Sequence, residues 1–396
     1  MPKRPNVIIK PDILRWARTS IHLSEEEVVE HFSKKTKLKF NINLDALKSL
    51  EKNEQAIAFS LLKELAALYK RPLAVFFLEK PLKEKPLPKD RRTLGSEVNI
   101  SFSRDGILVA RKARRIQEVT AELYKSLKID FKFPFKKYGS SDNAESVADT
   151  IRKKLGFTIE TQRSFRNSNE LFAHLRELIE GMGIVTLKQP FPIEDARAFS
   201  LTDQEPYVIV INSKDGGLNY APKAFSLMHE FAHLLLREGA ICNDFYHSHK
   251  SIESFCNQFS ASFLVPKKEF IVEHQRIAEN NDDLDEQLKQ LHKVFKVSHH
   301  ALLRRYESCQ LISNRFYQKK VSEWEKDFAE SYSLGTGFVP PQKPHKKAYV
   351  NNGKLFTNLV LQAHYENVIG YDAVSDYLDV KMKHIPSLED FAHSKT

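Results

Sequence analysis

Apolar residues recur with helical spacing along residues 11–80, which predicts an all-helical N-terminal region. Pro11 can start a helix through ILRWARTSI, and Ser24 followed by three glutamates is a capping-box start for EEEVVEHF. NLDALKSLEK and AFSLLKELAALY continue the pattern, and Pro72 admits a last apolar helix, LAVFFL. This region is therefore expected to be an all-α domain.

The middle of the chain combines helical and strand patterns. A long helical pattern covers residues 106–128, and NAESVADTIRKKLG and NSNELFAHLRELIEGMG predict two helices that end at glycine. Three runs rich in β-branched and aromatic residues, IVTLK, ARAFSL and PYVIVIN, predict a small β-sheet. Helical patterns follow at 222–236 and 251–265 and continue to about residue 311. The expected fold class is α+β and mostly helical.

Two stretches rich in proline and lysine divide the chain. EKPLKEKPLPKDRR, at residues 79–92, is the clearest linker, and the loop GTGFVPPQKPHKK precedes one or two helices between about residues 355 and 383. The pattern predicts an N-terminal domain, a linker, a central domain and a largely helical C-terminal region, at residues 1–80, 81–105, 106–311 and 312–396.

Composition indicates a globular intracellular protein. The 396 residues are 41% apolar and 28% charged, which suffices for packed cores and favours two or three domains. Three cysteines without a C-x-x-C pair argue against a disulfide framework. The N-terminus lacks an apolar signal region, and no stretch reaches the roughly 18 apolar residues of a membrane span. We expect a cytoplasmic protein without a membrane partner.

The positive charge is concentrated near the N-terminus. The formal net charge of the chain is +10, and residues 1–100 account for +7 of it. Such asymmetry makes a polyanion partner of the N-terminal quarter a hypothesis worth testing, although a basic face is more often merely solvated.

The most specific chemical signal is the H-E-x-x-H motif of His229, Glu230 and His233, which lies in an apolar helical pattern. A spacing of four residues places both imidazoles on one face of a helix, where they can bind one tetrahedral metal ion. Glu230 lies beside them, in reach of a metal-bound water. Burial of two histidines and a glutamate without partners is costly, and a bound metal removes that cost.

Catalytic zinc needs a third protein ligand and an open fourth position. Glu253 is the only acid in SIESFCNQFSASFLVP, a predicted core helix, and we favour it as the third ligand. Asp244, His247 and His249, in the intervening loop, are competing candidates. The pattern H-E-x-x-H-x-x-G-x-x-H is excluded because its glycine and its third histidine are absent.

These segments resemble the ImmA/IrrE-type metallopeptidases, whose domain is called IrrE N-terminal-like. FSLMHEFAH is similar to the family's F-T-x-x-H-E-x-x-H, and IESFCNQFSASFLVP to its E-x-x-A-N-x-F-A-x-x-L-x-x-P, with VIVINS ahead of them. The resemblance covers roughly residues 140–310. The sequence departs from the family where Thr, Ala and Ala are replaced by Ser226, Cys256 and Ser260.

The resemblance implies a gluzincin-like zinc endopeptidase, in which His229, His233 and Glu253 bind zinc and Glu230 is the general base. Zinc would polarise the scissile carbonyl and lower the pKa of its bound water, whose proton Glu230 would accept. The strand PYVIVIN could present an edge to an extended substrate peptide. Candidates for an oxyanion partner lie in the loop after the motif helix: Tyr246, His247 and His249.

The N-terminal region resembles the Xre-type helix-turn-helix domain that precedes this peptidase in many relatives. LKSLEKNEQAIAFSLLKELAALYKRPLAVFFL is similar to part of that domain, but Leu50, Asn53 and Ala56 or Ile57 replace its Trp, Gly and Pro. A docking domain that has lost DNA reading is therefore the alternative. The residues expected to contact DNA are polar and mostly basic: Lys34, Lys35, Lys37, Lys39, Asn41, Asn43, Lys48 and Lys52.

A second segment, LKQLHKVFKVSHHALLRRYESCQLIS, is similar to a helix-turn-helix-like unit that follows the zinc helices in this family. Arg304 and Arg305 could contact phosphate, although such a segment more often packs as structure. His299 and His300 are expected to be exposed rather than bound to metal.

The leading hypothesis is a zinc endopeptidase fused to a helix-turn-helix domain, which cleaves a regulatory protein such as a phage or mobile-element repressor or an antitoxin. The alternative is a DNA-binding transcriptional regulator whose zinc site is structural or vestigial. A third hypothesis is a toxin–antitoxin component that acts by contact alone. The zinc motifs favour the first, and the basic N-terminal quarter motivates the second.

Overall fold

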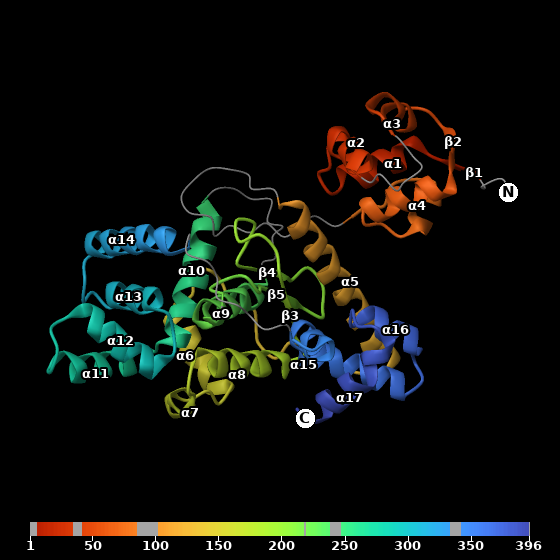
Figure 1. Cartoon of the computed structure of the whole chain (residues 1–396). Coiled ribbons are helices and arrows are strands. Elements are labelled where there is room, and N and C mark those ends of the chain that lie inside the picture. The colour runs from red at the N-terminus through yellow and green to blue at the C-terminus, as the bar shows by residue number, and fades with distance from the viewer. Residues whose placement is uncertain are drawn as a thin grey trace. The chain divides into compact units, whose positions relative to one another are not determined.

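The chain forms two compact units, one of residues 1–87 and 101–111 and the other of residues 88–100 and 112–396. The boundary between them falls within the long helix α5 (Arg104–Ser126). The computed structural model in Figure 1 describes residues 6–34, 42–84, 102–217, 219–237, 247–332 and 342–395.

The first unit is built mainly from short helices around an apolar core that includes Ile13, Val28, Leu47 and Leu62. Its helices are α1 (Pro11–Thr19), α2 (Glu25–Lys34), α3 (Leu44–Leu50), α4 (Phe59–Leu68) and η1 (Leu73–Phe77). The predicted helices are confirmed, but LAVFFL forms a 3-10 helix instead of an α-helix. The predicted capping box is present at the start of α2, where the amide of Glu27 donates to Ser24 Oγ at 3.1 Å.

The sequence pattern predicted an all-α first unit, but the structure shows that this unit also contains two β-strands. Strand β1 (Asn6–Ile9) pairs antiparallel with β2 (Gln55–Ala58), with Asn6 opposite Ala58 and Ile9 opposite Gln55. Each strand has only four residues, so neither carries a clear strand pattern. The pairing joins segments far apart in the sequence, and the packing of the helices between them brings these segments together.

The second unit contains three further strands, β3 (Val185–Gln189), β4 (Ala198–Leu201) and β5 (Val208–Asn212). Its helices after α5 are α6 (Ala144–Lys154), α7 (Ile159–Ser164), α8 (Ser168–Glu180), α9 (Ala221–Leu236), α10 (His247–Leu264), α11 (Lys267–Ala278), α12 (Leu284–Phe295), α13 (His299–Ser308), α14 (Asn314–Tyr332), α15 (Pro344–Tyr365), α16 (Tyr371–Tyr377), η2 (Met382–His384) and α17 (Ile385–His393). The described residues thus form a mostly helical fold with small β-sheets, in agreement with the expected class.

The strands form one sheet in the order β3-β5-β4. β5 runs parallel to β3 and antiparallel to β4, and all five of its residues are buried. The expectation that PYVIVIN presents an edge to substrate is therefore wrong, because β5 is hydrogen-bonded on both sides. A central strand is apolar on both faces, which explains its continuous apolar run. In the described part of the sheet, the edge strands are β3 and β4.

Helix α9 lies between the sheet and α10. It packs against β4 and β5, whereas α10 packs against α9 and α6. Figure 1 shows α9 and α10 side by side next to the sheet. The buried side chains of α9 and α10, including Phe231 and Phe259, belong to one continuous core. The helix that carries the H-E-x-x-H motif is thus held on two sides.

The C-terminal helices form part of the second unit. α15 packs against β3 and α8, and α16 and α17 pack against α15. α15 begins at Pro344, inside the stretch predicted to be a loop, because proline is well tolerated in the first turn of a helix. Its path is broken at Gly353, which has φ of 82° and non-helical geometry.

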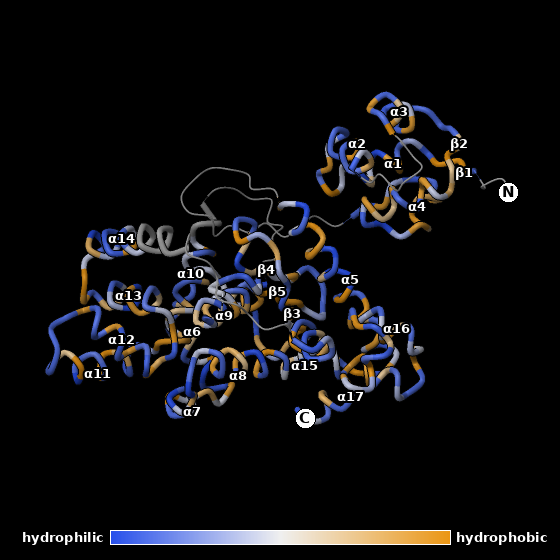
Figure 2. The backbone as a smooth tube through the Cα atoms, viewed as in Figure 1, coloured by the Kyte–Doolittle hydropathy of each residue, from blue (hydrophilic) through white to orange (hydrophobic). Residues whose placement is uncertain are grey.

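Figure 2 shows hydrophobic and hydrophilic residues alternating along helices such as α5 and α12. Each of these helices can therefore bury one face and expose the other. Within the part of the chain that the structure describes, no helix combines the length and the apolar character needed to cross a membrane.

Candidate metal centre

The H-E-x-x-H motif lies in the middle of α9, a helix that is buried along nearly its whole length. Met228 and Phe231 are 0% exposed, and His229 and Glu230 are only 1% and 4% exposed. The polar groups of the motif are therefore held inside an apolar helix, as the pattern predicted. Such groups need partners, because an unpaired buried polar group costs free energy.

The start of α9 is anchored by the buried Lys223. Its Nζ donates to the carbonyl oxygen of Gly217 at 2.8 Å and also to that of Asp215. Asp215 in turn accepts a hydrogen bond from Ser226 Oγ at 3.4 Å. Burial, helped by the positive charge of Lys188, lowers the pKa of Lys223 to about 8. These contacts fix the loop after β5 against the helix that carries the motif.

Because the pKa of Lys223 is lowered, we expect the free energy of unfolding to depend on pH. The folded chain releases the Lys223 proton near pH 8, whereas the unfolded chain keeps it to about pH 10.4. The unfolded state then binds more protons, so the free energy of unfolding should rise between these pH values by about 1 to 3 kcal/mol relative to Lys223→Met. Urea denaturation of both proteins at pH 7.5 to 10.5 measures this difference. Parallel stability curves would contradict it.

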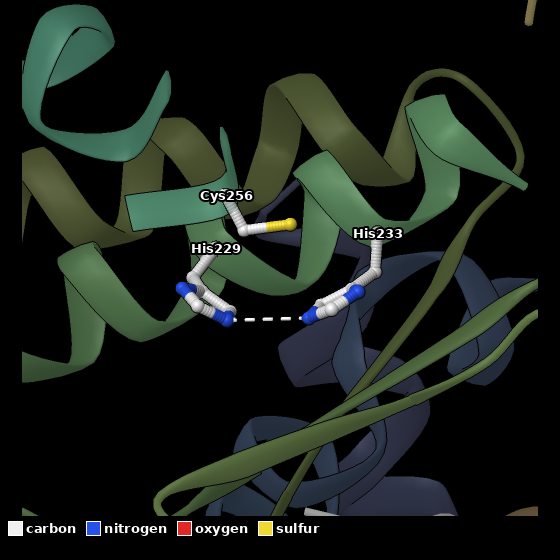
Figure 3. A group of neighbouring side chains, drawn as sticks. All are labelled: His229, His233 and Cys256. Carbon is white, nitrogen blue, oxygen red and sulfur yellow. Dashed lines mark hydrogen bonds between the residues drawn. The ribbon is translucent and has the colours of Figure 1, made fainter. Parts of the chain in front are cut away.

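The two histidines of the motif converge with Glu253 of α10. His229 Nε2 lies 3.2 Å from His233 Nε2. Glu253 Oε2 lies 3.2 Å from His229 Nε2, and Glu253 Oε1 lies 3.5 Å from His233 Nε2. Figure 3 shows the two imidazole rings facing each other from one helix. The structure therefore brings together the three residues that the sequence singled out as ligands.

The spacing of these three donors fits a tetrahedral zinc ion. Zinc binds nitrogen and carboxylate oxygen at about 2.0 to 2.2 Å, which separates neighbouring tetrahedral ligands by about 3.3 to 3.6 Å. The observed separations of 3.2 to 3.5 Å match this edge length. The His233 and Glu253 side chains are 16% and 20% exposed, so this side of the centre is open to solvent. Three protein donors and an open side are typical of a catalytic zinc site.

Asn257 orients His229. Its Oδ1 lies 3.1 Å from His229 Nδ1. An amide oxygen can only accept, so this contact places the imidazole proton on Nδ1 and leaves the Nε2 lone pair directed towards Glu253 and His233. Asn257 follows Glu253 by four residues, so one face of α10 supplies both a candidate ligand and the partner that orients His229.

Replacing Asn257 with alanine should weaken zinc binding by about 10- to 100-fold, because His229 loses the hydrogen bond that selects its tautomer. Competition with a zinc-chelating dye measures the affinity. Gln258→Ala is a matched control, since Gln258 is exposed and its side chain donates to exposed Ser254 one turn back. Equal affinities in the two variants would show that the Asn257 contact does not support the metal centre.

Glu230, adjacent to the first histidine, is held by a residue of the sheet. Ser200 Oγ, on β4, donates to Glu230 Oε2 at 2.9 Å. This hydrogen bond holds the Glu230 carboxylate against the edge strand β4 through its Oε2 atom. The arrangement suits a base that must stay beside the metal without binding it.

Cys256 is a further candidate donor at the centre. Its sulfur and one ring nitrogen from each of His229 and His233 all lie within 4.8 Å of one another. Cys256 is 0% exposed and projects from α10 close to the histidine pair (Figure 3). The centre therefore contains four candidate donors, and the oxygens of Glu253 lie 3.2 and 3.5 Å from the histidine nitrogens.

The other predicted site residues lie elsewhere or outside the described residues. Asp244 and Tyr246 lie outside the described residues, as do the side chains of His247 and His249. The prediction that Arg305 contacts phosphate is wrong, because Arg305 is only 3% exposed and is paired with Glu145. Buried arginines need such a partner.

Of the predicted DNA contacts, Asn43 caps α3 by accepting from the Ala46 amide at 2.8 Å. Lys34 pairs with Glu30, and Lys48 lies 3.7 Å from Glu25. Lys52 is exposed. The remaining predicted contacts lie outside the described residues: Lys35, Lys37, Lys39 and Asn41.

Sequence reasoning assigned no role in the centre to Ser200, Cys256 or Asn257. For the last two, a signal existed, because they follow Glu253 by three and four residues and so share its helical face. Ser200 carries no such signal. It lies 30 residues before Glu230, and only the packing of β4 against α9 brings the two together.

The comparison with protein families connects this geometry to a known domain. The model of the IrrE N-terminal-like domain, Peptidase_M78, matches residues 179–307, about a third of the chain. The matched region contains β3 to β5, the motif helix α9 and the ligand helix α10. The comparison with curated proteins found no match. The part of the chain that builds the metal centre is thus similar to a metallopeptidase domain of the ImmA/IrrE type.

Proposed function

We propose that the protein is a zinc-dependent endopeptidase that acts inside the cell on a regulatory protein. The observation that carries this proposal is the tetrahedral spacing of His229, His233 and Glu253 with Glu230 next to them. The similarity of residues 179–307 to a peptidase family supports the same chemistry. Zinc, when bound, would act as a Lewis acid that activates water and polarises the scissile carbonyl.

The chain's own residues would divide the remaining work. Glu230 accepts the proton of the attacking water and passes it to the leaving amine, so it acts first as base and then as acid. Ser200 holds the Glu230 carboxylate in place, and Asn257 holds His229 in the tautomer that binds metal. The apolar packing of α9 against the sheet and α10 keeps these groups fixed.

The edge strand β4 suggests how a substrate would lie. Its Ser200 contacts Glu230, so the strand runs beside the catalytic groups. β4 pairs with β5 on one side only, among the described residues. An extended peptide could add to the free side and place a peptide bond at the metal. We therefore propose that an unfolded or extended segment is cleaved, in a repressor of a phage or mobile element or in an antitoxin.

Co-expression with proteins encoded beside this chain tests the proposal. We expect one of them to appear as a shortened product, and mass spectrometry of its new ends identifies the cleaved bond. The purified chain should contain about one zinc per molecule and lose cleavage on chelation, with recovery on adding zinc. A chain that holds zinc but cleaves none of its neighbours nor an unfolded model protein would contradict the proposal.

A second candidate function belongs to the first unit. Its basic character and the resemblance to an Xre-type domain support contact with DNA through α2, α3 and the segment between them. Binding of the full chain to its own promoter should then fall steeply with salt, since each phosphate contact releases counterions. The Glu230→Gln variant should bind equally well. Absence of binding at low salt would leave this unit as a docking domain.

A further inference from the structure

The metal centre contains one donor more than a catalytic zinc site needs. Catalytic sites use three protein ligands, whereas structural sites use four. His229 and His233 come from α9, and α10 supplies both Glu253 and Cys256, three residues apart on one helical face. Thiolate sulfur is a preferred ligand of zinc. The ion could therefore be bound by the two histidines with either of two donors from α10.

The two donors on α10 differ in burial and in distance. The Glu253 side chain is 20% exposed, and its oxygens lie 3.2 and 3.5 Å from the histidine nitrogens. Cys256 is 0% exposed, and its sulfur lies within 4.8 Å of them. A zinc–sulfur bond of about 2.3 Å requires about 3.5 Å between the sulfur and the nitrogens, so the sulfur must approach by up to roughly 1 Å. Glu253 thus already lies at the spacing of a zinc ligand, and the sulfur of Cys256 lies within 4.8 Å of both histidine nitrogens.

We propose that Cys256 is a reserve zinc ligand. When Glu253 binds, the ion has two histidines, a carboxylate and an open position. When Glu253 is absent or displaced, the thiol of Cys256 loses its proton to solvent, and the sulfur lone pair forms the bond to zinc that the carboxylate gave up. The chain then keeps its metal in a buried, sulfur-bound state. This inference rests on the zinc site of the proposed function and adds a second ligand set to it.

Cobalt substitution distinguishes the two ligand sets without any assay of activity. Cobalt(II) bound to a thiolate has a near-ultraviolet charge-transfer band that cobalt bound to histidine and carboxylate lacks. The full chain with Cys242→Ala and Cys309→Ala, in which Cys256 is the sole cysteine, is the starting protein. We compare it with the same protein carrying Glu253→Ala, Cys256→Ala or both.

In the Glu253→Ala protein we expect bound cobalt with a thiolate band. Adding Cys256→Ala should remove the band and weaken zinc binding by at least about tenfold beyond the single variant. Cys256→Ser keeps the size of the side chain and should also lack the band, and circular dichroism of the metal-free proteins reports their folding. The inference is overturned if Glu253→Ala binds cobalt without a thiolate band, or if the double variant binds zinc as tightly as Glu253→Ala.

The test of Cys256 as a zinc ligand and the test of peptidase activity can fail independently of each other. If the chain is not a peptidase, the zinc-loaded wild type cleaves nothing, yet the spectra still report whether Cys256 binds. If Cys256 is not a ligand, the wild type still cleaves its substrate while Glu253→Ala shows no thiolate band.

Discussion

Replacing Glu230 with glutamine should lower the rate of peptide cleavage by about 10²- to 10⁴-fold, the usual contribution of a positioned general base. Glutamine keeps the size of the side chain and can still accept a hydrogen bond from Ser200, but its amide cannot take the proton of the attacking water. Glu230 is not among the three donors at tetrahedral spacing, so the variant should still bind about one zinc per molecule. Cleavage of the cognate protein and metal analysis measure the two quantities.

A matched control is Glu177→Gln, the same chemical change on the exposed side of α8 in the same unit. It should cleave at the wild-type rate and contain the same amount of zinc. If Glu230→Gln cleaves as fast as this control, Glu230 is not the base and the proposed mechanism is wrong. If it loses its zinc, the residue serves the metal site in some other way.

Replacing Gly353 with alanine should destabilise the second unit by about 2 to 5 kcal/mol, as strain at positive φ adds to overpacking. Gly353 has φ of 82° and lies where α15 crosses β3. A Cβ atom there would lie 2.8 Å from the carbonyl oxygen of Thr186 and 2.9 Å from Arg176 Nη2, and it would also clash with Glu180. These groups cannot easily move apart, because Arg176 Nε donates to Glu180 Oε1 at 2.9 Å in a partly buried contact. Urea denaturation measures the loss.

Gly156→Ala is the matched control for this prediction. Gly156 also has positive φ, at 63°, but a Cβ atom there meets nothing within 4 Å. Its substitution should cost about 1 to 2 kcal/mol, from backbone strain alone. Equal losses at both positions would mean that α15 does not pack closely against Glu180 and Thr186.

The contacts around Gly353 give a structural role to the C-terminal region. The amide of Leu355 donates to Glu180 Oε2 at 3.0 Å, and Arg176 Nη1 donates to the carbonyl oxygen of Val350 at 2.6 Å. α15 therefore satisfies buried charges of α8 and covers β3. Of the two edge strands in the described sheet, β4 is the one that contacts Glu230. β4 is therefore the edge at which we propose that a substrate peptide adds.

Local sequence patterns predicted most of the helices and singled out His229, His233 and Glu253, which the structure brings together. The four-residue spacing places His229 and His233 on one face of the same helix, and Glu253 is the only acid in a predicted apolar helix. Both features can be recognised from the sequence before the fold is known. The strands β1 and β2 were missed because each is short and pairs with a distant segment. The edge assigned to PYVIVIN was wrong because strand order does not follow from the pattern of a single strand.

By itself, the sequence singled out the motif histidines as candidate metal ligands and predicted which segments form helices, because both depend on periodicities of three to four residues. Only the tertiary structure decided what surrounds them. Ser200 reaches Glu230 because β4 packs beside α9, and Asn257 and Cys256 reach the histidines because α10 packs beside the same helix. Contacts between elements depend on how whole apolar faces pack together, and no local spacing records that arrangement.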